Sequence, residues 1–99
     1  MVIYNMKKRY EMYVYGKVQG VGFRSFVNKL SQNFNLVGNV QNLLNGSVKI
    51  ICECEETDFE KFNQTLILLA NKNYYISIDR IEVKMDSFKN EFSCFSIKY

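Results

Sequence analysis

The residues best suited to chemistry lie in one segment, Val14-Tyr15-Gly16-Lys17-Val18-Gln19-Gly20-Val21-Gly22-Phe23-Arg24. Three glycines within residues 16–22 allow consecutive backbone amides to point into one concavity, which is the geometry of an anion-binding nest. A helix expected to begin at Phe23 would add its unpaired N–H groups and the positive end of its dipole. Arg24 would lie in the first helical turn, where its permanently charged guanidinium suits a phosphate. The same pattern also fits a tight strand-to-helix connection with a surface arginine, so the residues alone leave both interpretations open.

The absence of histidine excludes several kinds of catalytic site. None of the 99 residues is His, so Ser-His-Asp and Cys-His nucleophiles, a His general base and a His-ligated zinc site are ruled out. The three cysteines form no Cys-x-x-Cys pair that would point to a metal. We therefore expect no cofactor and no metal, and an enzyme of this composition must work without the usual proton carrier of neutral pH.

Size and composition predict one small globular domain. The chain has a mass of 11.7 kDa, 47% hydrophobic residues and a formal net charge of +3. That charge suits a small anionic ligand and falls short of a dedicated polyanion binder. We interpret Lys7-Lys8-Arg9 as part of a solvated N-terminal leader over residues 1–9, followed by a single domain over residues 10–99. No signal peptide or membrane span is visible, and Cys52, Cys54 and Cys94 are interpreted as buried, reduced thiols of a cytoplasmic protein.

Hydrophobic periodicity predicts the order of the elements. An apolar stripe runs from Phe23 to Phe34 at helical spacing, and Asn45-Gly46 is typical of a hairpin turn between two strands. Thr57 and Glu60 fit a capping box at the start of a second helix, which Asn71-Lys72-Asn73 would end. The strands are expected over Tyr10–Tyr15, Leu36–Asn42, Ser47–Cys54, Ile76–Met85 and Phe92–Tyr99.

This order predicts an α+β fold of the ferredoxin-like, split βαβ type. It is a sandwich with a mostly antiparallel sheet and two helices on one face. The fold hosts many functions, so it does not assign one by itself.

Two motifs resemble signatures of the acylphosphatase family. The segment Val14–Arg24 matches the family's first signature without a gap: an aliphatic residue, one further residue, and then G-x-V-Q-G-V-x-F-R. The second signature, G-aromatic-V-x-N-x-x-x-G-x-V, is similar to a set of residues further along: Gly38, Val40, Gln41, Asn42, Gly46 and Val48. The resemblance extends over Tyr10–Tyr99, which is almost the whole chain.

The resemblance implies hydrolysis of the carboxyl-phosphate anhydride of small acyl phosphates to a carboxylate and inorganic phosphate. It assigns phosphate binding to Arg24 and the orientation of the attacking water to Asn42. The family's cradle of backbone amides falls on the loop of Gly16, Lys17, Val18, Gln19, Gly20 and Val21. We interpret the Gln19 side chain as supporting the shape of that loop.

The chain departs from the family's usual residues at three positions in or shortly after the second signature. Asn39 stands where the family usually has an aromatic residue, Cys54 where a glycine is usual, and Lys49 where acidic residues are frequent. None of these positions is Arg24 or Asn42, so activity stays the expectation.

Two other functions remain open at this point. One is a non-catalytic module that binds phosphate or an acyl phosphate. The other is an RNA-binding domain that stacks bases on Tyr13 and Tyr15, which share a strand face, although cross-strand packing is the preferred interpretation. We expect a monomer that uses a small acyl phosphate and has no membrane or nucleic-acid partner.

Overall fold

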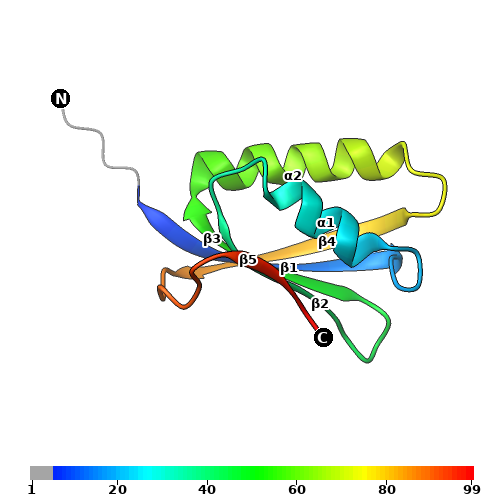
Figure 1. Ribbon diagram of the computed structural model, residues 1–99, viewed down its shortest axis with the longest axis horizontal. Helices are drawn as coiled ribbons and strands as arrows, with labels where there is room; N and C mark the ends of the chain where they lie inside the picture. Colours follow the sequence, from blue (N-terminus) through cyan, green and yellow to red (C-terminus); the bar gives the residue numbers. More distant parts are fainter. Residues whose placement is uncertain (1–5) are drawn as a thin grey trace.

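The computed structural model describes residues 6–99, in which two helices pack on one face of a five-stranded sheet (Figure 1). The elements in chain order are β1 (Lys7–Lys17), α1 (Phe23–Ser31), β2 (Val37–Asn42), β3 (Val48–Glu55), α2 (Glu56–Asn71), β4 (Ser77–Ser87) and β5 (Phe95–Lys98). The element order and the ferredoxin-like α+β class predicted from the sequence are confirmed.

The strands lie in the order β4-β1-β3-β2-β5 across the sheet. β1 pairs antiparallel with β3 and β4, and β2 pairs antiparallel with β3. Among the strands of residues 6–99, only β5 is parallel to its neighbour, β2. The chain therefore leaves one edge of the sheet at the end of β4 and returns at the opposite edge as β5.

The core lies between the sheet and the helices. Alternate strand residues point into this layer, as expected for a sheet with one covered face. The fully buried side chains that meet there include Met12, Val14, Phe23, Val27, Val40, Val48, Ile50, Cys52, Phe62 and Leu66. At one end of the layer the Tyr10 ring stacks on Phe59, with ring centroids 4.0 Å apart.

The cysteines are free thiols, but only two of them are buried. Cys52 and Cys54 point into the core from β3, as the sequence predicts. Cys94 is exposed, so the prediction of a buried thiol is wrong there. Its position explains the difference, because it lies in the surface connection just before β5, where no second layer covers it.

Strand β1 begins earlier than the sequence predicted. Residues 7–9 pair with β3 and are part of the sheet rather than of a solvated leader; residues 1–5 of that expected leader lie outside the described residues. The Arg9 side chain is buried, 3.8 Å from the Glu53 carboxylate and 3.3 Å from Glu91. A basic run gives no local sign of such burial, since its charge is compensated by residues far away in the sequence.

The start of α2 also differs from the prediction. The helix begins at Glu56, so Thr57 lies inside it and makes no capping hydrogen bond. Strand β3 runs directly into the helix, and Glu55 is the N-cap residue in an extended conformation. Because no loop separates the two elements, the capping box does not form.

Candidate active site

The loop between β1 and α1 presents backbone donors at the start of a helix. Gly20 and Gly22 have φ angles of 73° and 79°, in the left-handed region that favours glycine. Gly22 is the N-cap of α1 and has no side chain to satisfy the first helical N–H groups. The first intrahelical bond is donated by the Phe26 N–H to the Gly22 carbonyl, at 3.0 Å. The backbone N–H groups that precede Phe26 in the first turn of α1 are therefore free to bind an anion.

The loop, the first turn of α1 and the end of β2 enclose a pocket of about 110 Å³. The pocket is lined by Val18, Gly20, Gly22, Phe23, Arg24, Ser25 and Asn42. Arg24 and Asn42 thus line the same pocket, although they come from α1 and from the last position of β2. The packing of α1 against β2 brings these two elements together.

The Gln19 side chain connects the loop to the β2–β3 turn. Its amide nitrogen donates hydrogen bonds to the carbonyl oxygens of Leu43 and Ser47, both at 2.8 Å. Leu43 directly follows Asn42, so the tether holds the turn beside the pocket in a defined position. These contacts agree with the interpretation of Gln19 as a residue that shapes the loop.

Four residues of the expected cradle do not line the pocket: Gly16, Lys17, Gln19 and Val21. Gly16 and Lys17 lie in β1 and pair with Ile78 and Ser77 of β4. A Cβ at position 16 would lie 2.1 Å from the Ser77 carbonyl oxygen, so this glycine permits the close approach of β4. The Val18 side chain is 1% exposed and anchors the loop in the core.

Three residues that were not predicted to bind phosphate also line the pocket. The sequence pattern places Gly22 in the glycine-rich stretch and Phe23 in the apolar stripe of the helix, and it assigns no role to Ser25. A hydroxyl in the first turn of a helix that follows a glycine-rich loop was the available signal for Ser25.

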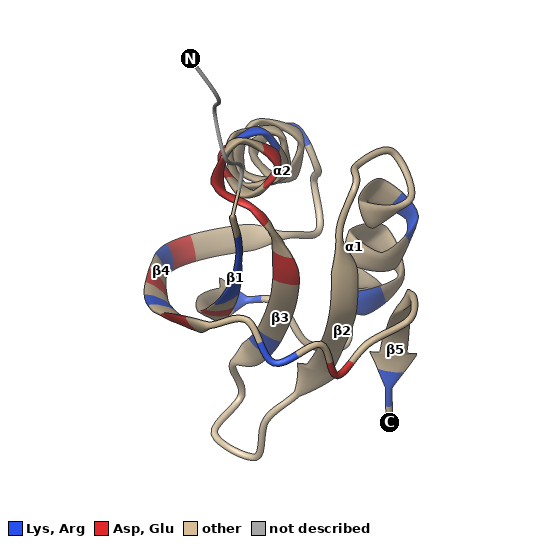
Figure 2. Ribbon diagram, turned by 90° about the vertical axis from the view of Figure 1, so that its left-hand side faces the viewer, with Lys and Arg blue, Asp and Glu red and all other residues tan. Residues whose placement is uncertain are grey.

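The surroundings of the pocket are electropositive. No Asp or Glu occurs between Glu11 and Glu53, a stretch that includes the loop, α1, β2 and most of β3. The charged residues of α1 are Arg24 and Lys29, both basic, and Figure 2 shows blue and no red on that helix. The Arg24 guanidinium lies over the Tyr99 ring, 4.9 Å from its centre, a cation–π geometry. This field favours an anionic ligand.

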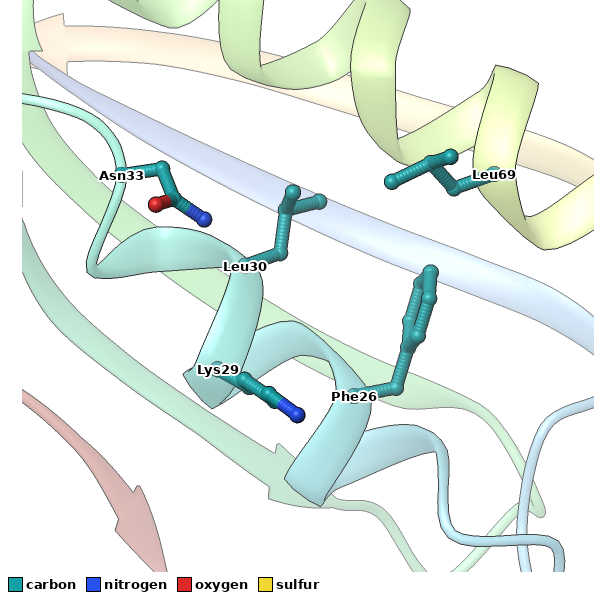
Figure 3. Close-up of a pocket in the computed structure, with 5 residues that line it drawn as sticks. All are labelled: Phe26, Lys29, Leu30, Asn33 and Leu69. Atoms are coloured by element: carbon teal, nitrogen blue, oxygen red, sulfur yellow. The ribbon is translucent and has the colours of Figure 1, made fainter.

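A second pocket, of about 190 Å³, lies between α1 and α2 (Figure 3). It is lined by Phe26, Lys29, Leu30, Asn33 and Leu69. At about 100° per residue, Phe26 and Leu30 lie on the side of α1 away from Arg24. The mainly apolar lining is that of an incompletely filled contact between two helices and has no group of converging donors for a phosphate.

The faces of Tyr13 and Tyr15 are occupied by cations of the protein itself. Arg80 lies 3.9 Å from the centre of the Tyr15 ring, and Lys49 and Lys84 lie 5.6 and 5.4 Å from that of Tyr13. These contacts support the interpretation of both tyrosines as packing residues of the sheet surface rather than as base-stacking platforms.

Within residues 6–99, no three His, Cys, Asp or Glu side chains are arranged to hold a metal ion. No helix in the same range is both long and apolar enough to span a bilayer.

Comparison with known proteins gives one consistent result. A family model described as Acylphosphatase matches residues 10–97. An acylphosphatase of Helicobacter hepaticus is 41% identical over 92 residues, which cover 88% of this chain and 96% of the relative. One from Borrelia garinii is 37% identical over 92 residues, with 90% and 96% covered. The crystal structure of an acylphosphatase from Bacillus subtilis superposes with a TM-score of 0.82 at 32% identity, covering 93% of this chain and 99% of that one.

Proposed function

The chain belongs to the acylphosphatase family and is a hydrolase of acyl phosphates, and we propose that its reaction takes place in the pocket lined by Arg24 and Asn42. In this proposal Arg24 and the backbone amides of the β1–α1 loop bind the phosphoryl group of a small acyl phosphate. Asn42 orients the attacking water, and the products are a carboxylate and inorganic phosphate.

The chemistry of the substrate explains how the reaction proceeds without histidine. The leaving group is a carboxylate whose conjugate acid has a pKa of about 4 to 5, so the departing oxygen needs no proton donor. Phosphoryl transfer needs mainly positioning and stabilisation of charge on the phosphoryl oxygens. Arg24 and the loop amides supply both, since their donors are fixed before the substrate binds.

Asn42 is neutral and acts by position rather than as a base. Its side-chain amide accepts from and donates to a water molecule, which it holds in line with the scissile P–O bond. The water oxygen forms the new bond to phosphorus as the bond to the acyl oxygen breaks. The water proton passes to a phosphoryl oxygen of the substrate, so no protein base is required.

One observation carries this proposal. The open N-terminus of α1, the Arg24 side chain and Asn42 meet in one small pocket beside a stretch of chain that has no acidic residue. An arginine and backbone donors together suit a phosphoryl group, and a neutral amide opposite them suits a water.

Release of inorganic phosphate from acetyl or benzoyl phosphate tests the function. We expect turnover with no added metal and in the presence of a chelator. Binding of phosphate without any turnover would instead identify a non-catalytic phosphate-binding module and would contradict the proposed reaction.

Two variants test the assigned roles. Arg24→Ala should lower kcat/KM about a thousandfold, because it removes the charged donor of the pocket. Lys29→Ala, which removes the other cation of α1, is the matched control and should have near-normal activity. Full activity of Arg24→Ala would exclude Arg24 from the site.

The second variant separates water orientation from phosphate binding. Asn42→Ala should lower kcat about a hundredfold while inhibition by inorganic phosphate stays nearly unchanged. Asn35→Ala, on the exposed connection between α1 and β2, serves as the control. Equal losses of turnover and phosphate affinity in Asn42→Ala would argue against the role of orienting water.

A cytoplasmic location is proposed from the cysteines. All three are free thiols, and free thiols are typical of a reducing compartment. Cell fractionation followed by immunodetection tests this proposal.

A further inference from the structure

β4 forms a long exposed edge of the sheet. It pairs with β1 on one side, and among residues 6–99 no strand pairs with its other side. Its eleven residues expose a row of backbone donors and acceptors, whereas the opposite edge, β5, has only four residues (Figure 1). A long exposed edge of this kind is a template for pairing with another strand.

One part of this edge is regular. The pairing of β4 with β1 shifts register between Tyr15 and Gly16, next to Asp79. From Arg80 onward the pairing proceeds residue by residue to Ser87. A new strand would therefore meet an undistorted run over residues 80–87.

Charges alternate in sign along one face of this run. Arg80, Glu82, Lys84 and Asp86 follow one another at every second position, and Figure 2 shows the basic and acidic bands along β4. Arg80 and Lys84 contact the rings of β1 tyrosines on the face away from the helices. Alternate residues of a strand share a face, so all four side chains lie on that side.

This pattern is complementary to itself when the strand is reversed. In an antiparallel pair of two β4 strands centred on Val83, Arg80 of each copy lies opposite Asp86 of the other, and Glu82 lies opposite Lys84. Opposite charges across a strand pair stabilise it, whereas like charges destabilise it. Centring the pair on Glu82 would instead place Glu82 opposite itself and Arg80 opposite Lys84. A pair centred on Ile81 or on Met85 forms only one kind of opposite-charge contact within this run, Arg80 with Glu82 or Lys84 with Asp86. The Val83 register forms two kinds and is therefore the one that the charges favour.

The other face of the same run is apolar. Ile81, Val83 and Met85 lie on the helix side, since their β1 partners are the core residues Val14, Met12 and Tyr10. Val83 is 44% exposed and Met85 60% exposed, which is unusual on the face that carries the core. The Val83 register places Val83 of one copy against Val83 of the other and Ile81 opposite Met85. The exposed side chains of Val83 and Met85 therefore lose contact with water.

We propose that β4 pairs with β4 of a second copy of this chain, antiparallel and centred on Val83. The two copies are related by a two-fold axis, and their five-stranded sheets become one continuous sheet. In this proposal the chain is a homodimer, whereas a monomer is expected from the sequence. It uses none of the pocket residues, so it is independent of the proposed reaction.

Sedimentation velocity over a wide range of protein concentration tests the dimer. We expect a reversible monomer–dimer equilibrium that shifts toward monomer at high salt, because edge-to-edge ion pairs are screened. A sedimentation coefficient of the monomer at every concentration up to millimolar would overturn the proposal.

Charge reversal tests the register. Glu82→Lys alone and Lys84→Glu alone each place like charges opposite each other twice in the dimer and should weaken it about tenfold or more. The double variant Glu82→Lys/Lys84→Glu restores opposite charges and should recover the original affinity. Lys61→Glu, an equal charge change on the exposed side of α2, should have little effect.

Each variant should release phosphate from acetyl phosphate at the rate of the unchanged chain, which shows that it is folded. A dimer that the single reversals leave intact would overturn the interface. Loss of the dimer in the single variants without recovery in the double variant would overturn the register.

Discussion

The guanidinium carbon of Arg24 lies 4.9 Å from the centre of the Tyr99 ring. Arg24 is in the first turn of α1, and Tyr99 follows β5 at the edge of the sheet. β5 pairs with β2, which ends at Asn42. The same pair of strands therefore carries Asn42 and places an aromatic ring under the arginine, so that both proposed catalytic side chains depend on this edge of the sheet.

Removing the Tyr99 ring should weaken the binding of phosphate. An exposed cation–π contact contributes about 0.5 to 1 kcal/mol, so Tyr99→Leu should raise both KM and the inhibition constant for inorganic phosphate about two- to fivefold. Tyr99→Phe keeps the ring and should stay close to the original values. Identical constants for the Leu and Phe variants would show that the ring does not position Arg24.

Gln19 should affect turnover although it does not line the pocket. Gln19→Ala removes two 2.8 Å hydrogen bonds to the turn after Asn42 and should lower the free energy of unfolding by about 2 kcal/mol. Because the turn positions Asn42, kcat should fall more than phosphate affinity does.

Two further variants control this prediction. Gln19→Glu places a carboxylate against two carbonyl oxygens and should be worse than the alanine variant at neutral pH, as measured by urea unfolding and steady-state kinetics. Gln64→Ala, at an exposed position of α2, should change neither quantity. A normal kcat in Gln19→Ala would show that the tether has no part in positioning Asn42.

Glu53 should be a major contributor to stability. Its buried carboxylate accepts hydrogen bonds from the backbone N–H groups of Lys89 and Glu91, at 2.7 and 3.1 Å, and lies 3.8 Å from Arg9. These contacts attach the connection between β4 and β5 to the middle of the sheet. Glu53→Ala leaves two backbone N–H groups without their acceptor and leaves Glu91, at 3.3 Å, as the carboxylate partner of the buried Arg9. We expect a cost of about 2 to 3 kcal/mol.

Equilibrium unfolding in urea measures this effect. Glu60→Ala removes an exposed carboxylate of α2 and should change the free energy of unfolding by less than about 0.5 kcal/mol. A loss below about 1 kcal/mol in Glu53→Ala would mean that the connection is held mainly by other contacts.

The buried thiols should make the fold sensitive to alkaline pH. Burial raises the pKa of the Cys54 thiol to about 12 and raises the pKa of Cys52 well above its ordinary value of 9.0. Both thiols are therefore neutral in the folded chain at pH values where they ionise in the unfolded chain. Their contribution to stability is complete below about pH 9 and is lost as the pH rises toward 12.

Urea midpoints measured at increasing pH check this sign. The unchanged chain should lose stability above about pH 9 more steeply than the variant Cys52→Ala/Cys54→Ala, which has no thiol on β3 to ionise. Cys94→Ala removes an exposed thiol and should follow the unchanged chain. Parallel curves for all three proteins would contradict the prediction.

Much of the fold was determined by local sequence patterns. The apolar stripe that starts at Phe23 predicted α1, and Asn45-Gly46 predicted the hairpin of β2 and β3. Periodicity works here because each helix or strand must bury one face against the same core. The ends of the elements were less well predicted. Thr57 does not cap α2, because β3 continues directly into the helix at Glu56. The residues of the helix alone do not indicate that the preceding loop is missing.

The candidate site divides in the same way between sequence and tertiary structure. The sequence determined the glycine-rich loop and Arg24, since a loop and the helix turn that follows it are local features, and a signature motif singled out Asn42. Only the tertiary structure decided that Arg24 and Asn42 line one pocket, that Gly16 serves the approach of β4, and that Tyr99 lies under the arginine. These relationships join residues far apart in the chain, and they exist only once the helices pack on the sheet and β4 and β5 take its two edges.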